Sequence, residues 1–240
     1  MKIIESIPEF RSLRQSLKGS VGFVPTMGYL HAGHVALVQE ARKENSTVVA
    51  SIFINPTQFG PNEDLESYPR DLEADKSALT KAGTDYVYYP SIEDIYPPTF
   101  DTYIEVGTVT EPLEGTKRPT HFRGVATVVT KLFNIVQPHR AYFGQKDGQQ
   151  VIVIKKMVDD LNIPIEIITV PTVRESDGLA LSSRNSYLTK HERNAATILY
   201  RSLSEAQSLY KNGQRNAEKL REAMRNILMT EPLANIEYIS

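Results

Sequence analysis

Two histidines three residues apart carry the strongest chemical signal in the chain. They lie in the segment 25–34, PTMGYLHAGH, which follows the apolar run 21–24 and opens a stretch with helical spacing. Glycines let a backbone pass close to a ligand, and a helix amino terminus attracts anions and disfavours a charged imidazole. Neutral His31 and His34 could therefore donate hydrogen bonds to phosphate oxygens. The alternatives are a polar helix start with surface histidines, or half of a metal site.

A second group of polar residues fills the segment 143–150, FGQKDGQQ, again between an apolar run and a helical pattern. Lys146 could neutralise charge on transferring or departing phosphates, Gly144 permits close approach of a nucleotide, and Gln150 could hold a polar substrate. The alternative is structural, because Asp147 and Gln150 have the spacing of a capping box that would leave Lys146 solvated.

A third group, Ser182, Ser183 and Arg184, lies in the loop 177–185. Hydroxyl groups followed by a guanidinium suit the β- and γ-phosphate oxygens, which Arg can bind with two hydrogen bonds. Such a loop could close over a bound nucleotide. Its composition is equally typical of a plain linker between domains.

A fourth group supplies uncharged amides. Asn55 and Gln58 follow the apolar run 48–54, and neutral amides could bind hydroxyls and a carboxylate while leaving that carboxylate nucleophilic. A turn built on Asn and Pro would explain the same residues. The segment 121–124, HFRG, could add a cation, or could be a helix cap with an exposed Arg123.

The elements that would position these groups alternate between strands and helices. Apolar runs predict strands at 21–24, 48–54, 86–89, 141–143 and 165–170. Helical spacing predicts helices at 34–43, 72–82, 125–136 and 149–161. This alternation indicates a Rossmann-like, doubly wound α/β sheet with parallel strands, in which ligands bind beyond the carboxyl ends of the strands.

The character of the chain changes after Val173, and we expect domains at 1–173 and 174–240. Thr189 and Glu192 have capping-box spacing, and helices are expected at 192–210 and 216–229. The residues 236–239 suggest a strand that begins as the sequence stops. We therefore expect a small α+β lid domain that is incomplete at its carboxy terminus.

Composition excludes several classes of protein. The 240 residues are 40% hydrophobic and 23% charged, as in an ordinary globular protein, and the absence of cysteine rules out disulfides and thiol chemistry. A formal net charge of −2 without a basic run argues against a nucleic-acid-binding protein. Glu5 and Pro8 interrupt any secretory signal, and no stretch approaches the roughly 18 apolar residues that span a membrane. We expect a cytoplasmic protein.

Together the motifs resemble the pantoate–β-alanine ligase (pantothenate synthetase) family. That family belongs to the nucleotidyltransferase superfamily, which shares the His-x-Gly-His loop with class I aminoacyl-tRNA synthetases. The matching segments occur in order at 24–28, 31–34, 51–59, 68–70, 121–125, 131–138, 144–150 and 177–185. Gln145 and Gly148 depart from the family pattern, which usually has Glu and an aromatic residue there.

The resemblance implies a reaction and a set of site residues. ATP and pantoate would give pantoyl-adenylate and pyrophosphate, β-alanine would then displace AMP, and Mg²⁺ would travel on the phosphates of the ATP. A homodimer is implied, as are catalytic roles for His34, His31 and Lys146. The residues implied for ATP are Met27, Gly28, Tyr29, Leu30, His31, Ala32, Gly33, His34, Gly144, Gln145, Lys146, Asp147, Val173, Leu181, Ser182, Ser183 and Arg184. Those implied for pantoate and β-alanine are Pro25, Met27, Asn55, Gln58, Tyr68 and Gln150.

Two other functions remain open on the residues alone. A nucleotidylyltransferase would need a basic pocket for a phosphorylated substrate, whereas Gln58 and Gln150 are neutral. A nucleotide-binding module without catalytic activity would have no need of Lys146 or of the Ser-Ser-Arg loop.

Overall fold

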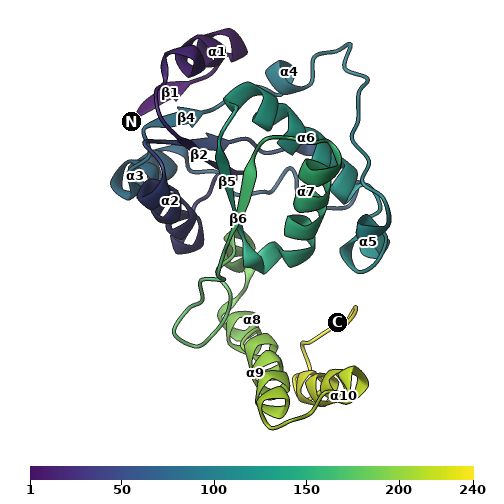
Figure 1. The fold of residues 1–240 in the computed structure, drawn as a ribbon. Helices are drawn as coiled ribbons and strands as arrows, with labels where there is room; N and C mark the ends of the chain where they lie inside the picture. Colours follow the sequence, from purple (N-terminus) through teal and green to yellow (C-terminus); the bar gives the residue numbers. More distant parts are fainter. The chain divides into compact units, whose positions relative to one another are not determined.

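Six parallel strands form the centre of the first of two compact units, residues 1–172 (Figure 1). The computed structural model describes all residues, 1–240, and residues 173–240 form the second unit. The strands are β1 (Lys2–Ile4), β2 (Val21–Thr26), β3 (Thr47–Ile52), β4 (Tyr86–Tyr88), β5 (Arg140–Gly144) and β6 (Glu166–Val170). Their order in the sheet is β1-β4-β3-β2-β5-β6, and every pairing is parallel.

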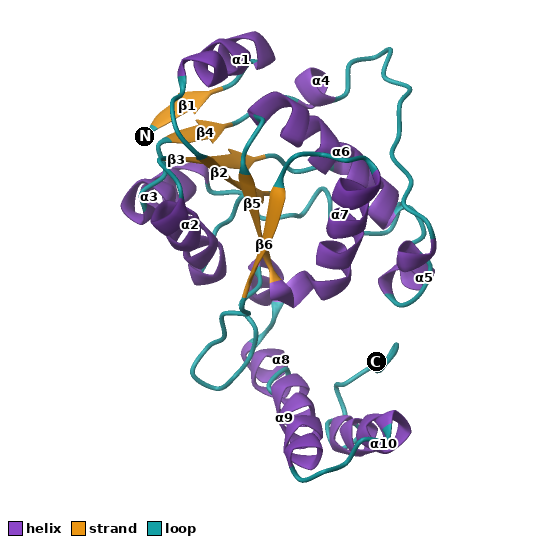
Figure 2. Cartoon of the chain, viewed as in Figure 1, coloured by secondary structure: helices purple, strands orange, loops and turns teal.

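Helices cover both faces of this sheet, which confirms the predicted doubly wound α/β fold (Figure 2). The helices of the first unit are α1 (Ile7–Ser16), α2 (Ala32–Glu44), α3 (Leu72–Ala82), α4 (Ile92–Ile95), α5 (Glu114–Lys117), α6 (His121–Val136) and α7 (Gly148–Asp160). Single 3₁₀ turns occur at η1 (Pro56–Gln58), η2 (Thr108–Thr110) and η3 (Gln145–Asp147).

Alternation along the strands divides the apolar side chains between two cores. Val21 and Phe23 of β2 pack with α1, α6 and α7, whereas Val24 packs with α2 and α3 on the opposite face. Successive side chains of a strand point to opposite faces, so a strand covered on both sides must be apolar throughout. This is why the buried strands could be predicted from short continuous apolar runs.

The order of the strands brings three loops to one edge of the sheet. β2 lies between β3 and β5, and all three run in the same direction. The turns that follow them therefore meet at their shared carboxyl edge. These turns carry the His-x-Gly-His segment after β2, Asn55 after β3 and Lys146 after β5.

The sequence patterns missed β1 and α1. β1 pairs with β4 as an edge strand of only three residues, which is too short to produce a periodic signal. Pro8 stands in the first turn of α1, where its missing N–H costs nothing, and Ser6 caps the helix by accepting a hydrogen bond from the Glu9 amide at 3.4 Å.

The second unit is helical in its regular elements. It contains η4 (Ser183–Tyr187), α8 (Lys190–Ala195), α9 (Ile198–Lys211) and α10 (Ala217–Leu228). The predicted capping box between Thr189 and Glu192 is confirmed. The single helix expected at 192–210 is interrupted at residues 196–197.

The prediction of a strand at residues 236–239 is wrong, since these residues form no strand. A strand needs hydrogen-bonded partners, and apolar alternation alone does not supply them. The β structure of this unit consists of an isolated antiparallel bridge between Arg174 and Ala180. No helix of either unit is both long enough and apolar enough to cross a membrane.

Gly124 provides a test of how tightly α6 packs on η1. A Cβ at this position would lie 2.3 Å from the carbonyl oxygen of Thr57 and 2.7 Å from the amide nitrogen of Gln58. Gly124→Ala should therefore lower the free energy of unfolding by about 1–3 kcal/mol, because backbone must move. Gly148→Ala is the matched control, because its Cβ would meet nothing within 4 Å. We expect this substitution to raise the free energy of unfolding by up to about 1 kcal/mol. Urea denaturation of both variants measures the difference, and equal stabilities would contradict the packing described.

Candidate active site

The turn between β2 and α2 has an unusual backbone. Gly28 and Tyr29 both adopt positive φ angles, +81° and +50°. Thr26 accepts a hydrogen bond from the Gly28 amide at 3.2 Å through its Oγ1, and that hydroxyl donates to the carbonyl of Ser51 at 2.7 Å. The turn is thus tied to the neighbouring strand β3, and it delivers His31 to the start of α2 as the N-cap.

The two histidines cap the helix together. His31 Nδ1 accepts a hydrogen bond from the Gly33 amide at 3.1 Å, and His34 Nδ1 accepts one from the His31 amide at 3.3 Å. The ring centroids lie 4.1 Å apart. A nitrogen that accepts from an amide carries no proton, so each neutral ring holds its proton on Nε2. Both Nε2–H groups are therefore donors, as hydrogen bonding to phosphate requires.

Burial and neighbouring charge keep both rings neutral. Burial is the main cause that lowers the pKa of His34, to about 3, with His31 and the Lys146 ammonium adding to the effect. The pKa of His31 is lowered by burial and then by Lys146, while Asp147 opposes the change. The Lys146 ammonium thus acts on both imidazoles, and it follows β5, the strand that pairs with β2 in the sheet. The structure thus gathers the three predicted residues at the carboxyl edge of β2 and β5.

Lys146 is exposed and pairs with its neighbour, Asp147, at 3.0 Å. Asp147 is the N-cap of α7, but its side chain makes no capping hydrogen bond. The capping-box alternative for this segment is therefore wrong. Gly144 ends β5 with open space where a Cβ would lie, and Gln150 is half-buried in the first turn of α7.

Asn55, which the family resemblance places at the small-substrate end of the site, lies in a network of hydrogen bonds within the protein, and its contact with a substrate stays a prediction. It is 1% exposed, and its Nδ2 donates to the Gln58 side-chain carbonyl at 3.1 Å and to the Gly124 carbonyl at 3.2 Å. The side-chain oxygen of Gln58 is thus engaged by Asn55. The other end of the Gln58 amide, Nε2, lies 3.1 Å from the sulfur of Met27. Asn55 thus orients Gln58 and leaves the NH₂ group of Gln58 as the available donor.

Tyr96 completes this network, and the sequence patterns gave no indication of it. Its hydroxyl donates to Asn55 Oδ1 at 2.8 Å, and the Thr57 hydroxyl donates to the same oxygen at 2.9 Å. Two donors at one end of the Asn55 amide fix which end faces Gln58. Tyr96 lies forty-one residues away in a segment without periodicity, so only the tertiary structure identifies it.

His121 and Arg118 anchor the segment after Gln58. His121 Nδ1 lies 2.9 Å from the Gln58 carbonyl oxygen, and Arg118 forms an ion pair with Glu63 at 2.6 Å. The Arg118 hydrogen bond keeps the pKa of Glu63 low, and burial lowers the pKa of His121. Arg123, the proposed extra cation, lies instead over the Tyr103 ring at 4.0 Å.

Two further residues predicted to bind substrate, Pro25 and Tyr68, are half-buried and buried, respectively. Pro25 is a half-buried residue of β2, in register with Ser51 of β3. Tyr68 is 5% exposed and packs edge-on against Phe59, with ring centroids 5.8 Å apart.

The predicted nucleotide residues of the second unit lie in an ordered loop. The Leu181 amide donates to the Val173 carbonyl at 3.1 Å, and Ser182 caps η4 by accepting from the Arg184 amide at 3.3 Å. Arg193 of α8 pairs with Asp177 at 2.8 Å. The segment is therefore not the plain linker that its composition also allowed. That Val173, Leu181, Ser182, Ser183 and Arg184 face ATP stays a prediction.

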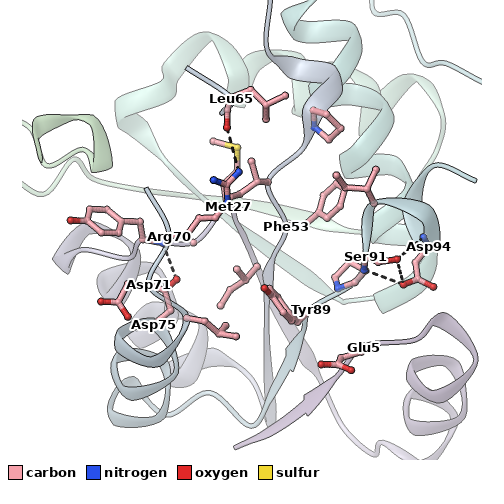
Figure 3. A pocket seen from close by; sticks show the side chains of 18 of the residues that line it. Glu5, Met27, Phe53, Leu65, Arg70, Asp71, Asp75, Tyr89, Ser91 and Asp94 are labelled. Atoms are coloured by element: carbon pink, nitrogen blue, oxygen red, sulfur yellow. Dashed lines mark hydrogen bonds between the residues drawn. The ribbon is translucent and has the colours of Figure 1, made fainter. Parts of the chain in front are cut away.

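A cavity of about 680 Å³ borders the β2–α2 turn on the side of β3 and β4 (Figure 3). Met27, Gly28 and Tyr29 line it, together with Arg70 and Asp75. His31, His34 and Lys146 do not line it. This is consistent with the strand order, because Lys146 follows β5 on the opposite side of β2.

Comparison with known proteins identifies relatives over the whole chain. Residues 2–240 match the family model described as pantoate-beta-alanine ligase. Proteins named pantothenate synthetase from Herpetosiphon aurantiacus and Chloroflexus aurantiacus are 57% and 58% identical. Each match covers 100% of this chain and 87% or 85% of the relative.

Solved structures agree with this family. Pantothenate synthetase from Thermus thermophilus superposes with a TM-score of 0.96 at 48% identity, covering 100% of this chain and 86% of that one. The pantoate-β-alanine ligase of Francisella tularensis, solved with β,γ-ATP and β-alanine, gives a TM-score of 0.83 at 41% identity. The match covers 95% of this chain and 86% of that one.

The low pKa of His34 predicts how stability depends on pH. A histidine in the unfolded chain gains its proton near pH 6.5, whereas folded His34 stays neutral down to about pH 3. The unfolded state therefore binds more protons within this window, and the free energy of unfolding falls as the pH drops below 6.5. One such group contributes at most about 1.4 kcal/mol per pH unit. In denaturant titrations between pH 7 and 5, the wild type should lose stability more steeply than His34→Gln; equal slopes would contradict the burial of a neutral ring.

Proposed function

Because the chain belongs to the pantoate–β-alanine ligase family, we propose that it joins pantoate to β-alanine at the expense of ATP. A carboxylate oxygen of pantoate attacks the α-phosphorus of ATP, and the bond to the departing pyrophosphate breaks. The amine of β-alanine then attacks the acyl carbon of pantoyl-adenylate, loses a proton and displaces AMP. The convergence of His31, His34 and Lys146 at the sheet edge is the observation that carries this proposal.

The imidazoles supply donors without supplying fixed charge. Their Nε2–H groups would bind oxygens of the α- and β-phosphates as negative charge builds on them. Lys146 would stabilise the departing pyrophosphate, and its present partner, Asp147, is exposed enough to release it. Charge stabilisation and positioning dominate phosphoryl-group chemistry of this kind.

The Gln58 amide would bind the small substrate. Asn55 engages its oxygen, so the NH₂ group, which now contacts the Met27 sulfur, would be the part of the amide that donates to a hydroxyl or carboxylate. A neutral donor holds the pantoate carboxylate without neutralising it, and so leaves it nucleophilic. Pro25 and Met27 would supply the apolar wall, and Tyr68 and Gln150 the remaining contacts.

We propose three further features on the family resemblance. The second domain, 174–240, acts as a lid whose Ser182, Ser183 and Arg184 meet the phosphates. Mg²⁺ enters on the ATP as part of the substrate. The enzyme is a cytoplasmic homodimer, which sedimentation equilibrium tests by its mass.

Release of AMP tests the reaction itself. With ATP, Mg²⁺ and pantoate alone, the enzyme should release pyrophosphate for no more than about one turnover, because the adenylate stays bound. Adding β-alanine should give continuous release of AMP and pantothenate. Continuous AMP release without the amine, or none with it, would reject the ligase assignment.

Removing one donor should slow the reaction strongly. His34→Ala and Lys146→Ala should each lower kcat by about 10²–10³, equivalent to about 2.7–4 kcal/mol of transition-state stabilisation. His34→Gln should retain more activity than His34→Ala, because its side-chain NH₂ replaces the Nε2–H donor. Lys156→Ala, an exposed lysine of α7 paired with Asp160, serves as the control. Near-normal turnover of folded His34→Ala would refute the role.

Gln58 should affect one substrate selectively. Gln58→Ala should abolish detectable pantoate binding in calorimetry while ATP still binds, because its NH₂ group donates to pantoate. Gln58→Glu, which keeps the size but loses that donor, should behave like Gln58→Ala. Loss of ATP binding with retained pantoate binding would reverse the assignment.

A further inference from the structure

The side chain of Asp75, in α3, binds the backbone of the β2–α2 turn. Its Oδ2 accepts a hydrogen bond from the Tyr29 amide at 2.8 Å, and its Oδ1 accepts one from the Leu30 amide at 2.7 Å. The residue comes from the first turn of α3 (Figure 3). It is only 3% exposed. Each carboxylate oxygen is thus matched to one of two consecutive amides.

These amides face Asp75 because of the backbone conformation. Positive φ angles at Gly28 and Tyr29 turn successive N–H groups toward one side, which creates a concave site for an anion. Left-handed backbone at a residue other than glycine costs on the order of 1–3 kcal/mol and persists only where the surroundings hold it. Two charge-assisted hydrogen bonds to a buried carboxylate provide that support.

Gly28 shows how closely the carboxylate approaches. A Cβ on Gly28 would lie 3.0 Å from Asp75 Oδ2 and 3.1 Å from Ile52 Cγ2. The glycine is therefore needed for its left-handed φ and for this contact. The His-x-Gly-His segment and the α3 carboxylate form one packed unit, although forty-five residues separate Leu30 from Asp75.

One consequence concerns the nucleotide. The amides of Tyr29 and Leu30 already bind an anion that belongs to the protein. They are not available to phosphate oxygens, so phosphate binding falls to side chains, above all to the two Nε2–H groups and the Lys146 ammonium. Asp75 would then control the chemistry through the turn without touching a substrate.

We propose that Asp75 is a positioning residue of the ligase reaction, which fixes the Gly28–Tyr29 turn so that His31 caps α2 and His34 presents Nε2–H to the phosphates. The proposal rests on the function proposed above. Substitution should disturb the histidines by displacing the turn, and misplacement of a catalytic group by about 1 Å can cost about 10²-fold in rate.

Hydrogen exchange tests the anchor without any activity measurement. In Asp75→Asn, the amides of Tyr29 and Leu30 should exchange at least about 10-fold faster, because the new side chain offers one acceptor in place of two. The amides in the centre of α3 should keep their protection. Glu73→Gln is the control on the same helix, where Glu73 forms only an exposed pair with Lys76. Unchanged exchange at residues 29 and 30 would overturn the proposal.

A double-mutant cycle with His34 separates positioning from general loss of structure. Asp75→Asn should lower kcat by about 10-fold to 100-fold in the wild-type background, with KM for pantoate within about twofold. In a His34→Ala background, the same change should lower kcat by less than about threefold, because the group it positions is absent. Equal losses in both backgrounds would overturn the proposal.

The test of Asp75 remains decisive in two cases: an Asp75→Asn variant that does not fold, and a wild type without ligase activity. If Asp75→Asn does not fold, Asp75→Glu takes its place; it keeps the charge and lengthens the side chain, and the same loss of kcat and coupling to His34 is expected. If the wild type itself shows no amine-dependent AMP release, the proposed function fails, whereas the exchange measurement still decides whether Asp75 holds the turn.

Discussion

Burial of His31 and His34 beside Lys146 keeps both imidazoles neutral, and the other features of the site depend on that constraint. Charged rings could not accept hydrogen bonds from the amides of Gly33 and His31, so the amino end of α2 would lose both caps. Neutral rings satisfy the helix with Nδ1 and keep Nε2–H for a ligand. The same hydrogen bonds thus serve helix formation and the proposed chemistry.

The surrounding fold supplies this environment by simple means. Parallel strands buried on both faces bring the turns after β2, β3 and β5 to one edge. Each of the first two turns is then fixed by a residue from another element. Asp75 of α3 holds the turn after β2, and Tyr96 holds Asn55, which in turn orients Gln58 within the turn after β3. Positioning is therefore divided among distant parts of the chain, whereas the groups available to a ligand are close together in sequence motifs.

This division explains what the sequence could predict. Apolar runs identified β2 to β6, and helical spacing identified α2, α3, α6 and α7. The strand pattern is most direct in β2 and β3, which are buried on both faces. The motif residues His31, His34 and Lys146 were singled out as candidates because each follows a predicted strand. Asp75 and Tyr96 were missed, since their roles arise from tertiary contacts across more than forty residues. Asn55 was singled out, but its place in a buried hydrogen-bond network was not predicted, because spacing cannot distinguish a buried orienting amide from an exposed one.

The most direct test of the central claim is the protonation state of the two rings. Nitrogen chemical shifts of His31 and His34, measured by long-range proton–nitrogen NMR at pH 7, report which ring nitrogen carries the proton. Both rings should be neutral with the proton on Nε2, and they should stay so when a non-hydrolysable ATP analogue binds. A charged ring, or a proton on Nδ1 in either histidine, would contradict the account.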